Sequence, residues 1–380
     1  MLSKFTVKNF KNFEKSFCID FSQTKSYEFS QDCVKNGIVK TGLIYGPNSI
    51  GKSNLGKAIF DIVQTLTNKE TVQELYHIYQ NALHPNAPVK FNYEFSFEGH
   101  ELVYSYKKIN YEYILTEKLS IGKEQVLSRT GKTFETSLKG LETLNRDELP
   151  LNMSALRYIR KNGILSDNPQ NVVVKQFFDF VDRMLMVQNL KENIYQGCFL
   201  GPKRVDEAIL KQNKLSELEK FLNSVDVQCK LSLRDDVNGK KRMCFDFGKN
   251  RRIDFWNNAS TGTVSLTHFF FWYIQALKDS TVAPSFMYLD EFDAFYHEKT
   301  ARTVVKMLSK LDCQVILTTH DSNLLSNELL RPDCAFNMTE EYRNTEEDKT
   351  YVLGPLSSVV KKELREAHNI PKMFRAKTFG

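Results

Sequence analysis

The sequence predicts an α/β fold, and three features of the chain carry this prediction. Near the N-terminus, an apolar strand pattern over 37–45 leads through a glycine-bearing loop into the helical pattern of 54–63. Two wholly apolar runs, 286–289 and 315–317, are separated by a helical segment, and such β-α-β spacing is typical of buried parallel strands. From residue 89 the apolar period changes to two, which predicts an additional antiparallel β lobe.

Length and composition limit the class of protein. The 380 residues exceed the usual size of one domain, so we expect one large domain with an insertion, or two domains. With 41% hydrophobic and 26% charged residues, the composition excludes collagenous, low-complexity and wholly disordered chains. The formal net charge of +6 is too small for a non-specific nucleic-acid coat, although a nucleic-acid partner remains possible.

The chain has the features of a cytoplasmic protein. No apolar stretch approaches the roughly eighteen residues that a membrane span needs, and no apolar run follows the first lysine. We therefore expect neither secretion nor contact with a membrane. The seven cysteines are an odd number, are widely scattered and form no CxxC pair, which favours reduced thiols in the cytosol.

The first half of the chain reads as strands around one helix. Two short strands at 5–7 and 18–21, separated by a polar turn, predict a hairpin. The strand, loop and helix of 37–63 follow. Alternating apolar residues over 91–97, 102–106 and 115–121 then predict an antiparallel meander.

The second half combines helices with further strands. The pattern over 152–222 is helical, and strands return at 229–233 and 242–247 around an Asn-Gly turn. A strongly apolar helix, 266–277, precedes the run at 286–289. We place its cluster of aromatic residues in the core rather than in a base-stacking site. These patterns divide the chain into 1–150, which holds the first part of the core with the antiparallel lobe; 151–225, a helical insertion; and 226–380, the second part of the core.

The loop after the first apolar strand has the sequence of a phosphate-binding loop. Its pattern is G-x-x-x-x-G-K-[ST], and it lies between a strand and a helix as that motif requires. Backbone N–H groups and the helix N-terminus would face phosphate oxygens, Lys52 would reach the β and γ phosphates, and the Ser53 hydroxyl would bind Mg²⁺. The predicted ATP-binding residues here are Gly46, Pro47, Asn48, Ser49, Ile50, Gly51, Lys52, Ser53 and Asn54.

Two adjacent carboxylates follow the apolar run 286–289. At the end of a buried strand, Asp290 would hold Mg²⁺ together with Ser53. Glu291 would polarise the attacking water as a general base, because a carboxylate beside the phosphate can accept its proton. By itself the pattern is common, and a solvated strand end is the alternative interpretation. The preceding phosphate-binding loop makes the catalytic interpretation the stronger one.

A histidine ends the other apolar strand. Strand 315–317 continues through Thr318 and Thr319 to His320, at an edge where neighbouring parallel strands would also end. His320 is therefore predicted to contact the γ-phosphate. A lone histidine is more often a core or surface residue, but here it follows the two nucleotide motifs.

The order of these motifs resembles the ABC-type ATPase superfamily. The resemblance implies an ABC-type P-loop core. It also implies that a signature loop at the start of a helix touches the γ-phosphate bound by a second copy, and Ser260, Gly262 and Thr263 occupy that place. It further implies a homodimer or a larger homo-oligomer that sandwiches ATP head to tail. The loop departs from the LSGGQ sequence of transporters, so an ordinary serine-capped helix start is the alternative.

The chain also resembles bacterial ATP-binding proteins of the OLD-like, abortive-infection type. This implies an anti-phage ATPase that gates a separate toxic effector, often a nuclease. Only about sixty residues follow His320, so we expect no fused TOPRIM nuclease. The resemblance rests on 5–13, the signature loop, Asp290-Glu291 with His297, Thr319-His320-Asp321-Ser322, Leu330-Arg331-Pro332-Asp333, Lys362-Glu363-Leu364-Arg365, Phe374-Arg375 and Phe379-Gly380.

Several assignments stay open at this point. Lys11 and Asn12 would contact nucleotide if they act as equivalent N-terminal loops do, or would form a plain hairpin turn. Asp293 and His297 would line the dimer interface, or would lie on an ordinary surface helix. The Q-loop glutamine is unassigned, with Gln64 and Gln125 as candidates by position. A basic C-terminal cluster over 361–377 would meet an acidic partner or form a solvated helix face.

A DNA clamp and a transporter subunit are the alternatives to a defence ATPase. The main alternative to a defence ATPase is a clamp of the RecF or SMC kind that closes on DNA for repair. The chain lacks the long heptads of SMC proteins, which leaves the RecF-like form, and salt-dependent DNA binding would identify it. A transporter subunit fits the altered signature poorly.

Overall fold

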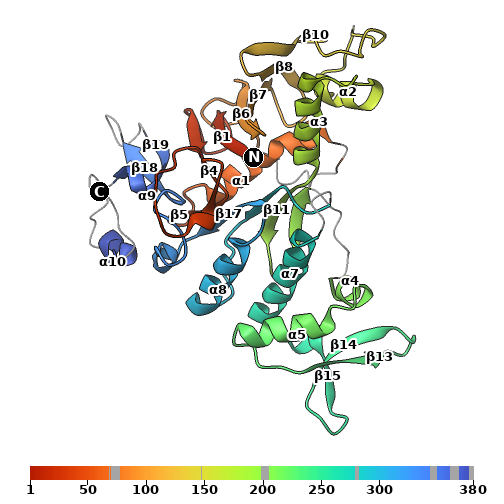
Figure 1. Cartoon of the computed structure of the whole chain (residues 1–380), viewed down its shortest axis with the longest axis vertical. Coiled ribbons are helices and arrows are strands. Elements are labelled where there is room, and N and C mark those ends of the chain that lie inside the picture. Colours follow the sequence, from red (N-terminus) through yellow and green to blue (C-terminus); the bar gives the residue numbers. More distant parts are fainter. Residues whose placement is uncertain are drawn as a thin grey trace.

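A computed structural model describes residues 1–67, 69, 78–146, 148–197, 205–278, 282–342, 349–359 and 368–375. Its centre is a seven-stranded sheet with the order β12-β11-β16-β17-β5-β18-β19. Figure 1 shows this sheet crossing the middle of the molecule. The strands are β5 (Thr41–Tyr45), β11 (Met184–Asn189), β12 (Ile194–Gly197), β16 (Phe286–Leu289), β17 (Gln314–Thr319), β18 (Ala335–Tyr342) and β19 (Lys349–Pro355).

The inner strands of this sheet are parallel. β11, β16, β17, β5 and β18 run in one direction, whereas β12 and β19 are antiparallel edges. Leu289 lies opposite Leu317, and Thr319 lies opposite Tyr45. The strands that carry the three nucleotide motifs therefore end at one edge. β16 and β17 are buried along their full length, which explains their continuous apolar sequence.

Helices cover both faces of the central sheet. Figure 1 shows α1 (Lys52–Leu66) and α3 (Pro169–Asp182) on one side and α7 (Thr261–Ala276) and α8 (Glu298–Leu308) on the other. α1 approaches the sheet at Gly56, where a Cβ atom would lie 2.6 Å from the Tyr288 ring. The aromatic cluster of α7 belongs to the core as predicted, with Trp272 only 1% exposed.

A second sheet forms the predicted antiparallel lobe. Its seven strands follow the order β10-β9-β8-β7-β6-β1-β2, and every pair is antiparallel. The Tyr93 hydroxyl donates to the Ala58 carbonyl of α1 at 3.0 Å, so the inner face of the lobe packs on the helix after the loop. The strands are β1 (Leu2–Lys8), β2 (Phe17–Asp20), β6 (Val89–Phe97), β7 (His100–Lys108), β8 (Ile114–Ile121), β9 (Glu124–Thr130) and β10 (Thr133–Thr136).

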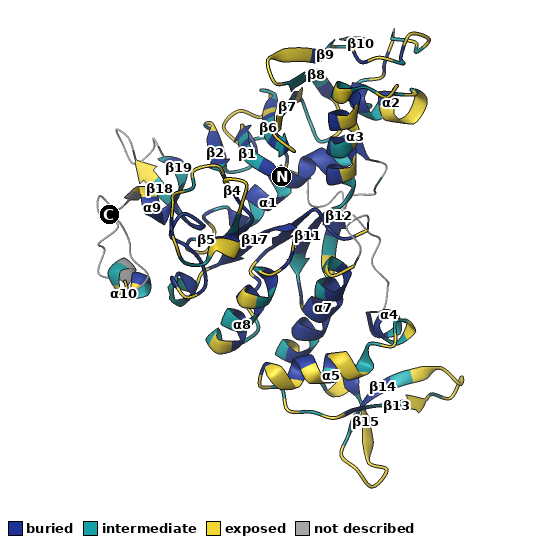
Figure 2. Cartoon of the chain, in the orientation of Figure 1, coloured by how far each residue is buried: buried dark blue, intermediate teal, exposed yellow. Residues whose placement is uncertain are grey.

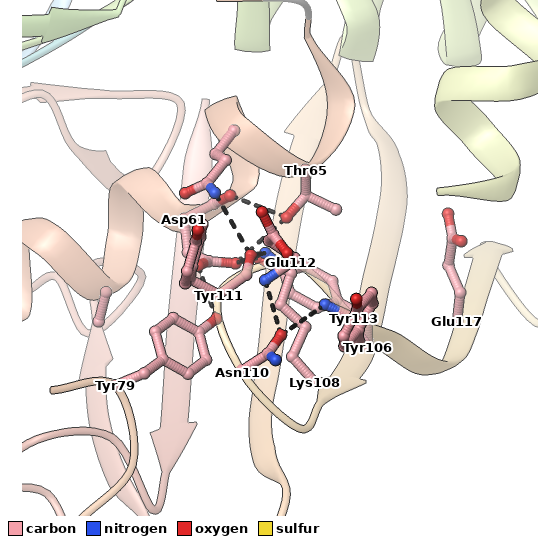
Figure 3. Close-up of polar contacts among 12 residues, drawn as sticks. Asp61, Thr65, Tyr79, Tyr106, Lys108, Asn110, Tyr111, Glu112, Tyr113 and Glu117 are labelled. Carbon is pink, nitrogen blue, oxygen red and sulfur yellow. Dashed lines mark hydrogen bonds and ion pairs between the residues drawn. The ribbon is translucent and has the colours of Figure 1, made fainter. Parts of the chain in front are cut away.

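A buried ion pair joins α1 to this lobe. The side chains of Asp61 and Lys108 are 0% and 1% exposed, and Nζ lies 2.8 Å from Oδ1. The hydroxyls of Tyr106 and Tyr79 donate to the same carboxylate at 2.7 and 2.6 Å. Figure 3 shows these side chains gathered around Asp61. Burial lowers the pKa of Lys108, and the Asp61 carboxylate opposes that shift.

The range 151–225 is only partly helical. It contains α2 (Ala155–Asn162), α3, α4 (Val205–Lys211) and α5 (Leu215–Ser224), but β11 and β12 also lie within it. β11 pairs in parallel with β16, so this part of the expected insertion belongs to the central sheet. The error has a simple cause, because a short apolar run such as 184–187 has no period that separates a buried strand from a helix.

A smaller sheet extends away from the body, at the foot of Figure 1. It has the order β13-β14-β15, and Figure 2 shows much of its surface exposed. Its strands are β13 (Leu231–Asp235), β14 (Lys241–Asp246) and β15 (Arg252–Asp254). The remaining elements are η1 (Gln31–Cys33), β3 (Val34–Lys35), β4 (Ile38–Val39), α6 (Phe255–Asn258), η3 (Ser322–Leu324), α9 (Leu356–Val359) and α10 (Ile370–Arg375).

The structure confirms the predicted fold class, an α/β P-loop core with an antiparallel β lobe and helices between its two parts. The boundaries at 150 and 225 remain a prediction. In the described part of the chain, none of the helices has both the length and the apolar character needed to cross a bilayer.

Candidate functional site

The loop 46–51 connects β5 to α1, as the motif requires. Gly51 precedes the helix with φ 110°, and Ser49 has φ 64°. A Cβ atom at Gly51 would lie 2.3 Å from Nδ2 of Asn12. The backbone angle therefore favours glycine there, and any larger residue would also displace the Asn12 side chain.

Lys52 lies over the loop rather than in solvent. Its side chain is almost fully buried, and Nζ donates to the carbonyls of Gly46 at 2.8 Å and Pro47 at 3.0 Å. Burial lowers the pKa of Lys52, while the Glu291 and Asp290 carboxylates act in the opposite direction. A cation held in this way, next to backbone N–H groups, fits the phosphates of a nucleotide.

Asn12 is part of the loop's surroundings. Its Nδ2 donates to the Ile50 carbonyl at 3.2 Å, and its Oδ1 accepts from Nδ2 of Asn54 at 2.7 Å. Of the two N-terminal candidates, Asn12 thus contacts the phosphate loop directly. Lys11 instead donates to the Ile78 carbonyl at 2.8 Å. A hollow of about 210 Å³ begins at Asn12 and is also lined by Phe13, Lys15, Lys349 and Tyr351.

Asp290 and Ser53 come together at the end of β16. The Asp290 side chain is buried, hydrogen-bonds the Ser53 hydroxyl, and accepts from Oγ1 of Thr318 at 2.8 Å. Burial raises the pKa of this carboxyl group, and the two hydroxyls limit the rise. A carboxylate beside a serine hydroxyl offers the hard oxygen ligands that Mg²⁺ prefers, so these residues fit the ion.

Glu291 lies at the exposed edge of the sheet in an unusual backbone conformation. Its φ is 44°, and its N–H donates to Oγ1 of Thr318 at 2.8 Å. Thr318 therefore binds both carboxylate residues, one through its hydroxyl hydrogen and the other through its oxygen. A left-handed glutamate costs on the order of 1–3 kcal/mol, and such conformations concentrate at functional sites.

His320 occupies the predicted edge. It is exposed and follows β17, which lies between the strand of the phosphate loop and the strand of Asp290. Next to it, Thr319 donates through Oγ1 to Oδ2 of Asp293 at 2.6 Å. Among the described residues, Oδ1 of Asp293 is buried without a hydrogen-bond partner. Burial raises the pKa of Asp293, and His320 acts against that shift.

The predicted signature residues form the first turn of α7. Oγ of Ser260 accepts from the Thr263 N–H at 3.2 Å and lies 2.9 Å from its Oγ1. A Cβ atom at Gly262 would lie 2.6 Å from the Phe295 carbonyl oxygen. Gly262 thus fits closely against the segment after Glu291. Among the residues that the structure describes, the hydrogen bonds of these hydroxyls stay within α7, so one chain does not join them to its own phosphate loop.

The remaining candidates lie elsewhere. Gln64 donates to the Tyr111 carbonyl at 3.3 Å, and Gln125 is exposed on β9, so neither candidate Q-loop residue is brought to the phosphate loop. His297 caps α8. Residues 361–367 and 376–380, which hold most of the basic C-terminal cluster and the chain ending used for the family resemblance, lie outside the described residues.

Sequence reasoning did not single out Thr318 and Thr319 as functional. Each places one hydroxyl on a carboxylate of the site. The available signal was a pair of threonines that ends a wholly apolar strand, because a buried hydroxyl needs a partner. The described residues contain no group of three or more His, Cys, Asp and Glu side chains that is placed to hold a metal ion.

Comparison with known proteins gives one family and several structures. Residues 209–326 match the family model "AAA domain, putative AbiEii toxin, Type IV TA system". The chain is similar, at 14% identity and a TM-score of 0.44, to the SMC head domain from Thermotoga maritima, over 93% of this chain and 98% of that one. No protein of curated function matches the sequence.

Two further structures are SMC heads in complexes. One is an SMC head bound to the C-winged helix domain of ScpA, with 14% identity, a TM-score of 0.47, and coverage of 94% of this chain and 99% of that chain. The other is an SMC head with an extended coiled coil bound to the C-terminal domain of ScpA from Pyrococcus furiosus, with 13% identity, a TM-score of 0.43, and coverage of 94% and 97%. Because these TM-scores lie below 0.5, the functional assignment rests on the site residues instead.

Proposed function

We propose that this protein is a slow Mg²⁺-dependent ATPase whose nucleotide state controls a separate toxic effector in bacterial anti-phage defence. The observation that carries the ATPase part is the meeting of Lys52, Ser53 and Asp290 at one edge of the parallel sheet. The match of residues 209–326 to a domain family named for an AbiEii toxin supports the defence context.

The side chains divide the chemistry between them. Lys52 exchanges its carbonyl partners for the β and γ phosphates, while the N–H groups of the loop bind the same oxygens. Asp290 and Ser53 would hold Mg²⁺, which would neutralise charge on the phosphates. Glu291, exposed at the sheet edge, accepts the proton of the attacking water, and His320 contacts the γ-phosphate. The ribose and base occupy the hollow beside Asn12.

The working unit is a dimer that sandwiches two nucleotides. Ser260, Gly262 and Thr263 of one copy complete the site of the other. In support, among the residues that the structure describes, the hydroxyls of Ser260 and Thr263 hydrogen-bond each other at the start of α7 and do not bond the phosphate loop of their own chain. ATP then stabilises the dimer and hydrolysis releases it, which couples chemistry to assembly. The dimer works in the cytoplasm on an effector that is a separate chain, a toxin of the nuclease type.

A clamp of the RecF or SMC kind is the second candidate. The observation that favours it is a row of four exposed lysines on the antiparallel lobe: Lys8, Lys90, Lys107 and Lys118. In that function the same ATP-dependent dimer would close on DNA instead of holding an effector.

The test uses light scattering together with ATP turnover. Glu291→Gln should bind ATP-Mg²⁺, form a stable dimer and hydrolyse at least about 100-fold more slowly than wild type. Lys52→Ala is the matched control and should neither bind nor dimerise. Turnover of Glu291→Gln at the wild-type rate would refute the assignment of the base. Co-expression with the neighbouring gene product tests the effector, which should co-purify with the ATP-bound dimer.

A further inference from the structure

One end of the outer face of the antiparallel lobe carries a cluster of lysines, whereas Glu94 and Glu101 lie nearer its other end. Alternate residues of β1, β6, β7 and β8 point away from α1, while the residues between them are buried. Four exposed lysines lie on this outer face, and we call them the lysine row: Lys8, Lys90, Lys107 and Lys118.

The strand register brings these charges together. Lys8 lies opposite Lys90, and Lys90 lies opposite Lys107 on the next strand. Lys118 is the diagonal neighbour of Lys107, because Lys107 pairs with Thr116. Directly opposite side chains are about 5 Å apart at Cβ, and like charges at that distance destabilise a sheet. None of the four forms an ion pair with any acidic side chain that the structure describes.

A hollow accompanies the lysine row. It has a volume of about 560 Å³ and crosses the four strands. Between the lysines it presents small polar side chains, namely those of Thr6, Asn92, Ser105 and Thr116. The face thus combines unpaired cations with short hydrogen-bonding groups in a shallow concave surface.

These residue types indicate the ligand. Lysine, serine, threonine and asparagine are among the side chains that bind the phosphates and sugars of nucleic acid. A protein partner would need an aromatic or large apolar anchor, and a single strand would need aromatic rings for its bases. The outward positions of β1, β6, β7 and β8 hold no aromatic residue, and the aromatic rings of β6 and β7 are buried on the other face.

We propose that the lysine row binds the phosphate backbone of a nucleic-acid duplex without reading its sequence. Phosphates bound between the lysines would offset the repulsion between their positive charges. This would explain why the fold tolerates like charges on neighbouring strands. This binding does not depend on the proposed ATPase cycle, because the face is separate from the phosphate loop and α1 packs against the opposite side of the sheet.

The test compares two variants with the same change of charge. In the first, glutamine replaces the four lysines of the row. In the control, glutamine replaces four other exposed lysines, Lys123, Lys132, Lys139 and Lys240. Fluorescence anisotropy with labelled duplexes of two unrelated DNA sequences, each about 30 base pairs long, the corresponding duplex RNA and a single strand gives Kd at several salt concentrations. Both variants are assayed without nucleotide, and Lys52→Ala separates this binding from the ATPase function.

The expected result is specific to the lysine row. The row variant should bind duplexes at least about tenfold more weakly, and the salt slope should fall by about 0.9 for each phosphate that the protein no longer neutralises. The control variant and Lys52→Ala should bind like wild type. Urea denaturation should show the row variant to be at least as stable as wild type, because repulsion is removed.

Three results would overturn the proposal. Equal loss of affinity in the two glutamine variants would mean that only net charge matters. A preference for the single strand would contradict the duplex ligand. Binding of polyglutamate in preference to every nucleic acid would assign the face to an acidic protein.

Discussion

Asp290 shows at the scale of one residue how function opposes stability. Its carboxyl group is buried, and this burial raises its pKa above the usual aspartate value. Between the usual and the raised value, the folded protein holds a proton that the unfolded chain has lost. Stability therefore falls as pH rises through that window, and above it the full cost of burying the charge remains.

This linkage predicts that Asp290→Asn stabilises the protein in the absence of nucleotide. At pH 7 the variant should melt above wild type, and the difference should shrink as pH falls and the wild-type carboxyl becomes protonated. ATP-Mg²⁺ should raise the melting midpoint of wild type and not of the variant. Thermal melting at several pH values measures both effects, with the exposed Asp235→Asn as the control that should melt like wild type. A variant less stable than wild type at pH 7 would contradict the prediction.

Gly262 gives a second prediction at this scale. In a helix, alanine is ordinarily more stable than glycine by about 1 kcal/mol. Here a Cβ atom would lie 2.6 Å from the Phe295 carbonyl, so the segment after Glu291 would have to move. Gly262→Ala should therefore destabilise the protein by about 1–3 kcal/mol in urea denaturation and also slow ATP turnover. A gain in stability would show that helix propensity outweighs the close contact.

The residues of the site differ in how far sequence reveals them. Lys52, Asp290 and His320 each follow an apolar run that predicts a buried strand. Because parallel strands end at the same edge of a sheet, it was predictable that these three residues lie at one edge. The role of Thr318 was not predictable, because it depends on two hydrogen bonds to residues 28 and 27 positions away. The left-handed backbone of Glu291, whose N–H donates to Thr318, likewise has no local signal in the sequence.

At the scale of elements, α1 joins the nucleotide to the antiparallel lobe. Its first turn holds Lys52, and its third contains Asp61, which Lys108, Tyr106 and Tyr79 contact from the lobe side. In Figure 3 these contacts converge on one carboxylate. Lys108 directly follows Lys107 of the lysine row on β7, but Lys108 is buried on the inner face of the lobe and Lys107 is exposed on its outer face.

A double-mutant cycle measures the strength of the buried ion pair between α1 and the lobe. Asp61→Asn leaves the buried Lys108 cation without its counter-charge and should cost about 3–5 kcal/mol in urea denaturation. Lys108→Met in the same background should recover part of that stability, because the unpaired charge is removed. Lys107→Met, one residue away and exposed, is the control and should change stability by less than about 0.5 kcal/mol. Additive effects in the double variant would show that the two charges do not interact.

Whether a segment is a helix or a strand was predictable where its apolar residues recur at a regular spacing. Lys108 continues the inward positions 102, 104 and 106 of β7, so the alternation itself indicates a buried lysine that needs a partner. In contrast, Met184–Asn189 offers only a short apolar run with no period, and its surroundings predict a helical insertion. Its pairing with β16 depends on residues about one hundred positions away, which no local pattern reports.

At the scale of the whole molecule, the two sheets have different tasks. The parallel sheet gathers the nucleotide residues at one edge, and the antiparallel lobe presents the lysine row on the face opposite α1. The sequence predicts both sheets, because the parallel sheet has continuous apolar runs and the antiparallel lobe has apolar residues at every second position. For the extended sheet β13-β14-β15, which α6 separates from the signature turn, the sequence predicts only a pair of strands, because β15 has just three residues.

The head-to-tail dimer gives the last prediction, since each site would combine residues of two copies. Lys52→Ala removes the phosphate lysine, and Ser260→Asp keeps a good helix cap on α7 while placing a negative charge against the partner-bound phosphate. Each variant alone should be inactive. When both are mixed in equal amounts, each mixed dimer contains one site with an intact lysine and an intact signature, and ATP bound at that site can hold the mixed dimer together. Because one of its two sites is intact, ATP turnover should then return to at most about half of the wild-type rate if the two sites act independently. A mixture as inactive as its components would contradict the shared site, and would place Ser260 in the site of its own chain.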